Sequence, residues 1–238
     1  MAALKMVSAV AKRSLDKAAA DALRQAIVSG EVQPGTRLTE MEIAAQFELS
    51  RGTIRAALQR LMGEGLIVQR PYSGWEVATL TSHDVWELYT LRASLEGLAA
   101  RLAASHPDRR ARMEIAFDAL KAAADSGDGR EITEADLSLH KTIVSLAGHS
   151  RLASQYDVVE QQVRMFMASS NAILPRSAML IENHVPLVTA VSEGDPDLAE
   201  RCASVHSTSS GEILVRHLEA QQHTHAGEAA EPPKPGWR

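Results

Sequence analysis

Apolar residues recur three and four positions apart through most of this chain, which is the spacing of an amphipathic helix. The first such stretch predicts a helix over residues 15–29, which ends at Gly30 in a segment rich in glycine and proline. A second helix is expected after Thr39, because a threonine followed three residues later by Glu42 forms a capping box. A third follows Ser50 as its N-cap and is ended by two glycines.

The pattern changes from helical to extended after this third helix. In "IVQRPYSGWEVATL", Val68 precedes a "PYSG" turn and Trp75 and Val77 follow it, which predicts strand, turn and strand. Three helices followed by a two-stranded wing are typical of a winged helix-turn-helix. The last helix of that motif, here the third predicted helix, enters the major groove of DNA. We therefore expect residues 1–78 to form a DNA-binding domain.

The start of the third helix supplies the side chains most suited to reading DNA. Arg51 and Arg55 lie four residues apart, on the face opposite the apolar stripe, and an arginine fork can bind guanine O6 and N7. Simple solvation of a helix face is the alternative explanation for these two charges. Hydroxyl groups and a helix N-terminus can bind phosphates. The full set of candidate DNA contacts is Arg37, Thr39, Glu40, Ser50, Arg51, Gly52, Thr53, Arg55 and Gly74.

The segment "PGTRLTEMEIAAQFELSRGTIRAALQRLMGEGLIVQRPYSGWEV" resembles the N-terminal domain of GntR-type bacterial transcription regulators. Gly52 and Thr53 stand where that family usually has Thr-Pro, and Ala56 stands where it usually has Glu. The resemblance implies a homodimer that binds a palindromic operator, and these departures bear on the operator sequence. The matching positions are Pro34, Gly35, Leu38, Glu40, Ile43, Ala44, Ser50, Arg51, Arg55, Ala57, Leu58, Gly65, Leu66 and Gly74.

Beyond residue 82 every pattern is helical, and short polar or glycine-containing breaks separate the helices. Short connections are typical of a helical bundle. The predicted fold is therefore mainly α, with a winged helix-turn-helix over 1–78, a linker over 79–82 and a six-helix bundle over 83–219. The polar, proline-rich residues 220–238 are expected to be a disordered tail. The predicted helices lie near 83–104, 108–125, 131–147, 151–172, 178–193 and 195–219.

Three of the nine histidines fall inside predicted helices on apolar faces. These are His140, His184 and His206, and Asp136 lies one helical turn before the first of them. Imidazole and carboxylate groups are good ligands for divalent metals, and bundle cores build metal sites from facing helices. A buried histidine with an ordinary hydrogen-bond partner, or an ion pair between Asp136 and His140, is the alternative at each position.

Residues 83–219 resemble the all-helical FCD effector domain of FadR-like GntR regulators, whose metal-binding members have Asp-x-x-x-His on one helix and single histidines on two later helices. Asp136, His140, His184 and His206 match those positions, and the resemblance implies Zn²⁺, Mn²⁺ or Ni²⁺ with a small organic acid as effector. Leu139 and Asn183 depart from the usual aromatic residue and Glu. Arg92 is the candidate anchor for the effector's carboxylate, with a salt bridge to Glu96 as the alternative.

Composition narrows the choice of function. The net charge of −5 divides into about +2 for residues 1–80 and about −7 for the rest, which suits a head that meets an anionic partner. Cys202 is the only cysteine, and no apolar run is long enough to span a membrane, so we expect a cytoplasmic, nucleoid-associated protein. The prediction is an effector-controlled transcription regulator and not an enzyme. The alternatives are a metalloenzyme and a regulator that senses only metal.

Overall fold

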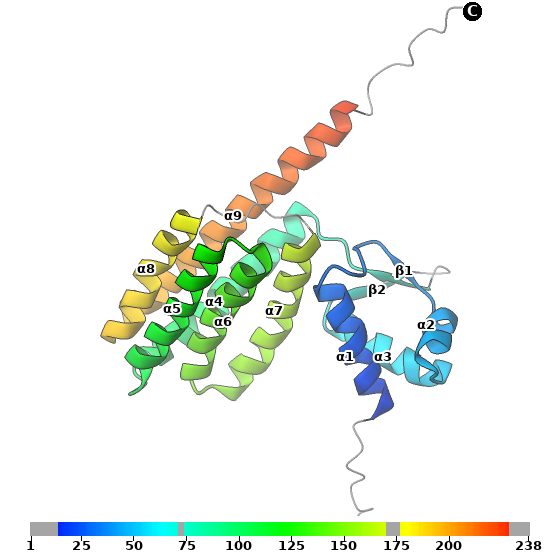
Figure 1. Ribbon diagram of the computed structural model, residues 1–238, viewed down its shortest axis with the longest axis horizontal. Helices are drawn as coiled ribbons and strands as arrows, with labels where there is room; N and C mark the ends of the chain where they lie inside the picture. The colour runs from blue at the N-terminus through cyan, green and yellow to red at the C-terminus, as the bar shows by residue number, and fades with distance from the viewer. Residues whose placement is uncertain (1–13, 71–73, 170–176, 229–238) are drawn as a thin grey trace, which may run out of the picture. The chain divides into compact units, whose positions relative to one another are not determined.

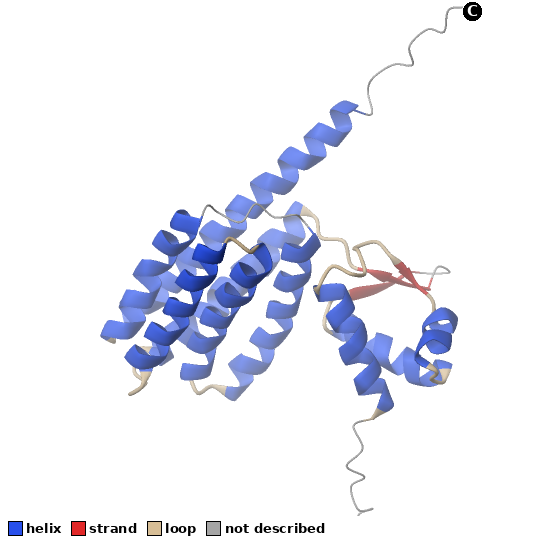
Figure 2. Cartoon of the chain, viewed as in Figure 1, coloured by secondary structure: helices blue, strands red, loops and turns tan. Residues whose placement is uncertain are grey.

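The computed structural model describes residues 14–70, 74–169 and 177–228, and it describes side chains in these ranges except at 169, 177–178 and 221–228. The chain divides into two compact units, Met1–Ala78 and Thr79–Arg238. The division falls at the end of the predicted DNA-binding domain. The first unit joins helices to a small sheet and the second is helical throughout the described residues (Figures 1 and 2).

The first unit has the predicted helices and wing, and one strand that the sequence analysis did not predict. The short strand β1 pairs with β3, and β3 pairs with β2, both antiparallel, so that β3 is the central strand. Two residues are too short a stretch for an alternating pattern to show. The predicted turn at 71–73 lies outside the described residues. The elements are α1 (Leu15–Val28), β1 (Arg37–Leu38), α2 (Glu40–Phe47), α3 (Arg51–Gly63), β2 (Ile67–Arg70) and β3 (Gly74–Val77).

Helix α3 is held in place by its apolar stripe, and this leaves its other face to solvent. Ile54, Leu58 and Leu61 are fully buried, as their spacing predicted. Ion pairs fix its C-terminal half against α1, where Arg24 binds Glu64 with 2.6 Å between Nε and Oε2. The N-terminal turn of α3, with Arg51 exposed, is therefore presented on a rigid support.

The second unit contains the six predicted helices, and two of the predicted boundaries need correction. Ser82 belongs to α4 and not to the linker, because Thr81 caps this helix in a capping box with Asp84. The predicted disordered tail is wrong for residues 220–228, where α9 continues, and the rest of that prediction, 229–238, lies outside the described residues. Ala, Gln and Glu favour helix there, and no proline interrupts the helix before Pro232. The helices are α4 (Ser82–Ala103), α5 (Arg109–Ser126), α6 (Gly129–Leu146), α7 (Ser150–Ser169), α8 (Ser177–Glu193) and α9 (Pro196–Glu228).

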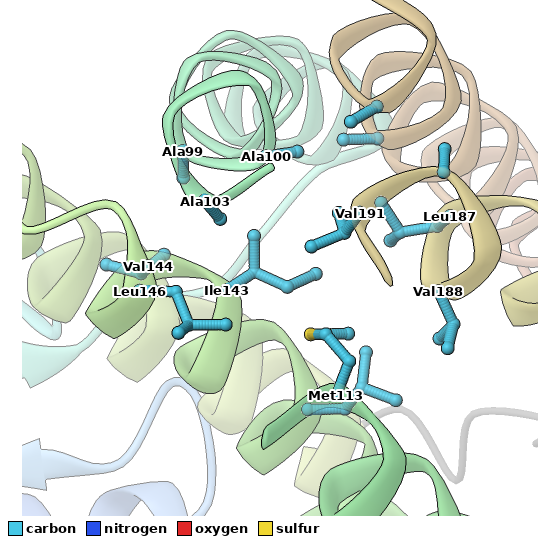
Figure 3. Packing of buried hydrophobic residues seen from close by; sticks show 14 of the residues in the cluster. Ala99, Ala100, Ala103, Met113, Ile143, Val144, Leu146, Leu187, Val188 and Val191 are labelled. Atoms are coloured by element: carbon cyan, nitrogen blue, oxygen red, sulfur yellow. The ribbon is translucent and has the colours of Figure 1, made fainter. Parts of the chain in front are cut away.

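The bundle core lies where α4, α5, α6 and α8 meet, and Figure 3 shows Met113, Ile143 and Val191 among its side chains. Helices α4 and α9 pack closely against each other, with Gly97 and Gly211 at their contact. A Cβ added at Gly211 would lie 2.5 Å from the Cβ of Tyr89, so only glycine fits this point of α9. The close approach of these two helices positions the polar groups at the centre of the bundle.

Candidate metal site and DNA-binding surface

The N-terminus of α3 is ordered by its own hydroxyl groups. Ser50 accepts a hydrogen bond from the backbone N–H of Thr53 at 3.1 Å, which confirms it as the N-cap. Its Oγ also lies 2.8 Å from the Oγ1 of Thr53. Gly52 is exposed, and a Cβ there would approach nothing closer than 3.8 Å, so folding does not require a glycine at this position. These polar groups and the exposed helix N-terminus together make a surface suited to phosphate.

Glu40 of α2 organises the two arginines of α3. Arg55 donates to it from Nε and Nη2, each at 2.8 Å, in a bidentate fork. Nη2 of Arg51 lies 3.7 Å from the same carboxylate, and the indole N–H of Trp75 in the wing donates to it at 3.5 Å. The hydrogen bond from Arg55 lowers the pKa of Glu40, which outweighs the opposing effect of its partial burial. Glu40 is thus a scaffold for the arginines, which remain more than half exposed at 56% and 66% of their side-chain surface.

The remaining candidate DNA contacts border this surface. Thr39 caps α2 by accepting from the N–H of Glu42, as predicted, and its hydroxyl donates to the Glu42 carboxylate. Arg37 is exposed on β1. Gly74 opens β3 with a φ of 87°, a left-handed conformation that favours glycine. Of these three residues, Arg37 is exposed to solvent, whereas the cap at Thr39 and the positive φ at Gly74 give a structural reason for the residue type.

The three predicted histidines converge in the middle of the bundle from three different helices. His140 of α6 and His184 of α8 are buried, and their Nε2 atoms lie 3.3 Å apart. The His206 ring of α9 has its centre 4.2 Å from that of His184 and 5.0 Å from that of His140. One potential ligand atom from each histidine lies within 4.8 Å of the others. Residues far apart in the sequence thus form one cluster of imidazoles.

Each of the three rings has an acceptor beside its Nδ1 atom. The Leu180 carbonyl lies 2.8 Å from that atom of His184, and the Asn183 carbonyl lies 3.3 Å from that of His206. Glu96 Oε2 lies 3.1 Å from Nδ1 of His140, although the N–H direction misses the ideal line. A proton on Nδ1 leaves Nε2 with a free lone pair. Metal-ligating histidines have this arrangement, with an outer acceptor that fixes the tautomer.

Asp136 contacts the three-histidine cluster through His184 and not through His140. Its Oδ1 lies 3.0 Å from Nε2 of His184, across two helices, so the predicted same-helix ion pair is not the observed contact. Burial alone would raise the pKa of Asp136, but the His184 contact holds it below its usual value. Burial likewise lowers the pKa of His184, and the Asp136 contact outweighs it and raises that pKa. The carboxylate therefore stabilises positive charge at the point where the histidine nitrogens meet.

This donor set fits a divalent metal. Two ligand atoms that share one ion at roughly 2.1 Å are about 3.0–3.4 Å apart when adjacent. The separations of 3.3 Å between the two histidine nitrogens and 3.0 Å from Asp136 to His184 agree with that spacing. Burial lowers the pKa of His206 to about 3, which favours the neutral form of that ring, the form that can act as a ligand.

Arg92 and Glu96 form a buried ion pair beside the histidines. Arg92 Nε donates to Glu96 Oε1 at 2.7 Å, which was the alternative explanation for Arg92. That contact does not use the whole guanidinium, because Nη2 of Arg92 is buried without a hydrogen-bond partner among the described residues. Glu96 also accepts from Tyr156 at 2.7 Å and from Ser207 at 2.6 Å. Sequence reasoning missed Tyr156 and Ser207, since neither has a motif.

Known protein families match both units of the chain. The FCD domain family matches residues 87–209, and the gntR family of bacterial regulatory proteins matches residues 15–77. The chain belongs to the GntR family and carries an FCD domain. It is a transcriptional regulator with a DNA-binding head, and the expectation that it is not an enzyme is confirmed.

Relatives of this GntR regulator include two named repressors. The "Probable D-xylose utilization operon transcriptional repressor" of Paenarthrobacter nicotinovorans is 31% identical over 202 residues, covering 84% of this chain and 86% of the relative. The gluconate operon transcriptional repressor of Bacillus licheniformis is 28% identical over 183 residues, covering 74% and 75%.

Two solved structures share this fold. One from Rhodococcus sp. RHA1 aligns with a TM-score of 0.72 at 23% identity, covering 84% of this chain and 97% of that chain. McbR/YncC of E. coli aligns with a TM-score of 0.67 at 23% identity, covering 89% and 100%. Over the part of the GntR regulator that the structure describes, no helix is long and apolar enough to cross a membrane.

Proposed function

We propose that this GntR regulator contains a metal and that a small carboxylate bound in its helical domain sets its affinity for operator DNA. The observation that carries the proposal is the convergence of His140, His184 and His206 with Asp136, each ring having an acceptor beside Nδ1. Asp136 and the three imidazoles would hold a divalent ion of the Zn²⁺, Mn²⁺ or Ni²⁺ class. Four protein ligands leave positions open on an ion that prefers six.

The charges around this cluster favour an anionic effector. Asp136 and Glu96 carry negative charge, Arg92 carries positive charge, and all three are buried. With neutral imidazoles the group has a net charge of about −1, and a divalent ion changes it to about +1. Net charge is costly to bury, so one carboxylate would bring the site to neutrality. Nη2 of Arg92, a buried donor that has no partner within the described residues, would bind that carboxylate.

The operons named for two relatives suggest which class of small carboxylate to test first as the effector. One acts on a gluconate operon and another on D-xylose utilization, so a sugar acid is the first class to test. A hydroxy acid offers the metal a carboxylate oxygen and a hydroxyl oxygen together. In this proposal the protein is cytoplasmic and works as a homodimer on a palindromic operator, because two-fold symmetry presents two heads to two half-sites.

The proposal is tested by metal content. We expect tag-free protein to retain close to one divalent ion per chain, and His184→Ala or His206→Ala to lose it. His83→Ala is the matched control, because His83 is exposed at the start of α4, where it pairs with Glu87 and stacks on Trp86. Elemental analysis that finds full occupancy in both site variants would refute the site. Metal-dependent operator affinity that no carboxylate alters would favour a regulator that senses only metal.

A further inference from the structure

Glu96 joins four helices through hydrogen bonds to three side chains and an ion-pair contact to a fourth. It is 2% exposed and lies on α4. Its Oε1 accepts from Arg92 of the same helix and from Tyr156 of α7, both at 2.7 Å. Its Oε2 accepts from Ser207 of α9 at 2.6 Å and contacts Nδ1 of His140 on α6 at 3.1 Å. No other buried carboxylate among the described residues has recorded contacts to as many different helices.

This carboxylate is saturated, which excludes it from binding the metal itself. Two carboxylate oxygens offer about four lone-pair positions, and four donors surround them. The always-charged guanidinium of Arg92 pairs with Glu96 at 2.7 Å and stabilises it as an anion. Glu96 is therefore a fixed anion with all its acceptor positions in use, and one of them faces a candidate metal ligand.

We propose that Glu96 is a positioning residue that sets the tautomer of His140. By accepting the proton on Nδ1, it leaves the lone pair on Nε2, which is the nitrogen that faces His184. A carboxylate acceptor also makes the imidazole a stronger donor toward a metal. This inference rests on the proposed metal site, but its effect on the tautomer is present in the metal-free protein as well.

Glu96→Gln gives a specific test, because only the oxygen of an amide group can accept hydrogen bonds. Arg92 can only donate, so the amide oxygen of Glu96→Gln must face Arg92 and the amide NH₂ must face Ser207 and His140. The hydroxyl of Ser207 can turn to accept, but Nδ1 of His140 must then become an acceptor too. The His140 proton moves to Nε2 and occupies the metal-facing lone pair.

The first measurement is the ¹⁵N chemical shifts of the His140 ring in metal-free protein. We expect the proton on Nδ1 in the wild type and on Nε2 in Glu96→Gln. Tyr156→Phe is the matched control, because it removes a donor from Oε1 and leaves the Oε2 side intact; its His140 tautomer should match the wild type. A wild-type ring with its proton on Nε2 overturns the inference even if the glutamine variant does not fold.

The second measurement is affinity for Zn²⁺, obtained by competition with a chelator. Loss of an outer-shell partner typically weakens metal binding about 10–100-fold, and we expect that loss in Glu96→Gln and a change within about threefold in Tyr156→Phe. Equal losses in the two variants would mean that Glu96 only supports the bundle, and would overturn the inference. If wild-type protein binds no metal but the tautomer switches as described, the proposed metal site fails and the positioning role of Glu96 stands.

Discussion

At the scale of single residues, the proposed recognition of DNA uses two arginines that Glu40 positions on the surface of α3. The bidentate contact between Arg55 and Glu40 fixes the guanidinium before DNA arrives, so less side-chain freedom is lost on binding. The sequence predicted the place of these arginines from helical spacing. It did not predict the role of Glu40, because that depends on how α2 crosses α3.

Arg55→Ala should weaken operator binding by roughly 1–3 kcal/mol and relax base preference at one position, because the proposed contact between Arg55 and a base edge would be lost. Arg51→Ala should have a similar effect. Arg60→Ala is the control on the same helix, since Arg60 pairs with Asp16 of α1 and lies away from the helix N-terminus. Quantitative footprinting of the three variants is the measurement. Unchanged affinity and preference in both Arg51→Ala and Arg55→Ala would rule out α3 as the reading helix.

Gly52→Ala separates folding from DNA binding at one position. The site has room for a Cβ, and alanine is favoured over glycine in a helix by up to about 1 kcal/mol, so the melting temperature should rise slightly. If the backbone here approaches DNA closely, operator affinity should fall at the same time. Calorimetry and a binding titration on one preparation decide this, and a stabilised variant with full affinity would show that Gly52 has no role in DNA contact.

At the scale of the elements, patterning predicted the helices well and their ends less well. Apolar spacing located α4 to α9 because each of them buries apolar residues in the bundle, and breakers such as Gly194 marked the turns between them. The extension of α9 through 220–228 was missed because a polar composition does not distinguish a helix from a disordered segment. The network around Glu96 was missed for another reason: Tyr156 and Ser207 meet it only through the crossing of three helices.

Gly211→Ala tests how closely α4 and α9 must approach. The new Cβ would lie 2.5 Å from the Cβ of Tyr89, an atom close to the backbone that cannot move aside cheaply. We expect a loss of about 1–3 kcal/mol in the free energy of unfolding, the usual result of overpacking. Ser209→Ala, two residues away on an exposed position of α9, should change stability little. Urea denaturation showing equal stability for both variants would contradict the tight contact.

At the scale of the whole molecule, the metal should stabilise the folded protein because the unfolded chain cannot bring three helices to one ion. Binding at a free concentration 100 times the dissociation constant adds about 2.7 kcal/mol to the stability. Chelation should therefore lower the melting temperature of the wild type and leave that of His184→Ala unchanged. A scanning calorimetry experiment in which chelator shifts both proteins equally would indicate that the metal binds elsewhere.

In the proposed mechanism, effector binding would act on the DNA-binding unit through α4, the first helix of the second unit. This helix carries Arg92 and Glu96, and its N-cap, Thr81, follows the last residue of the head by three positions. An effector can change DNA affinity only as far as it binds the two states of the protein differently. A carboxylate that binds both the metal and Arg92 would make that difference by drawing α4 toward α6, α8 and α9.

The central claim is that the metal site controls DNA binding, and one titration tests it most directly. Operator DNA, recovered by selection from random duplexes, is titrated with wild-type protein in the presence and absence of a carboxylate chosen for a metal-dependent thermal shift. We expect the carboxylate to change operator affinity by about 1–3 kcal/mol, the usual range for such coupling, and to have no effect after chelation. Chelated protein that responds to the carboxylate as fully as the metal-loaded protein would contradict this account.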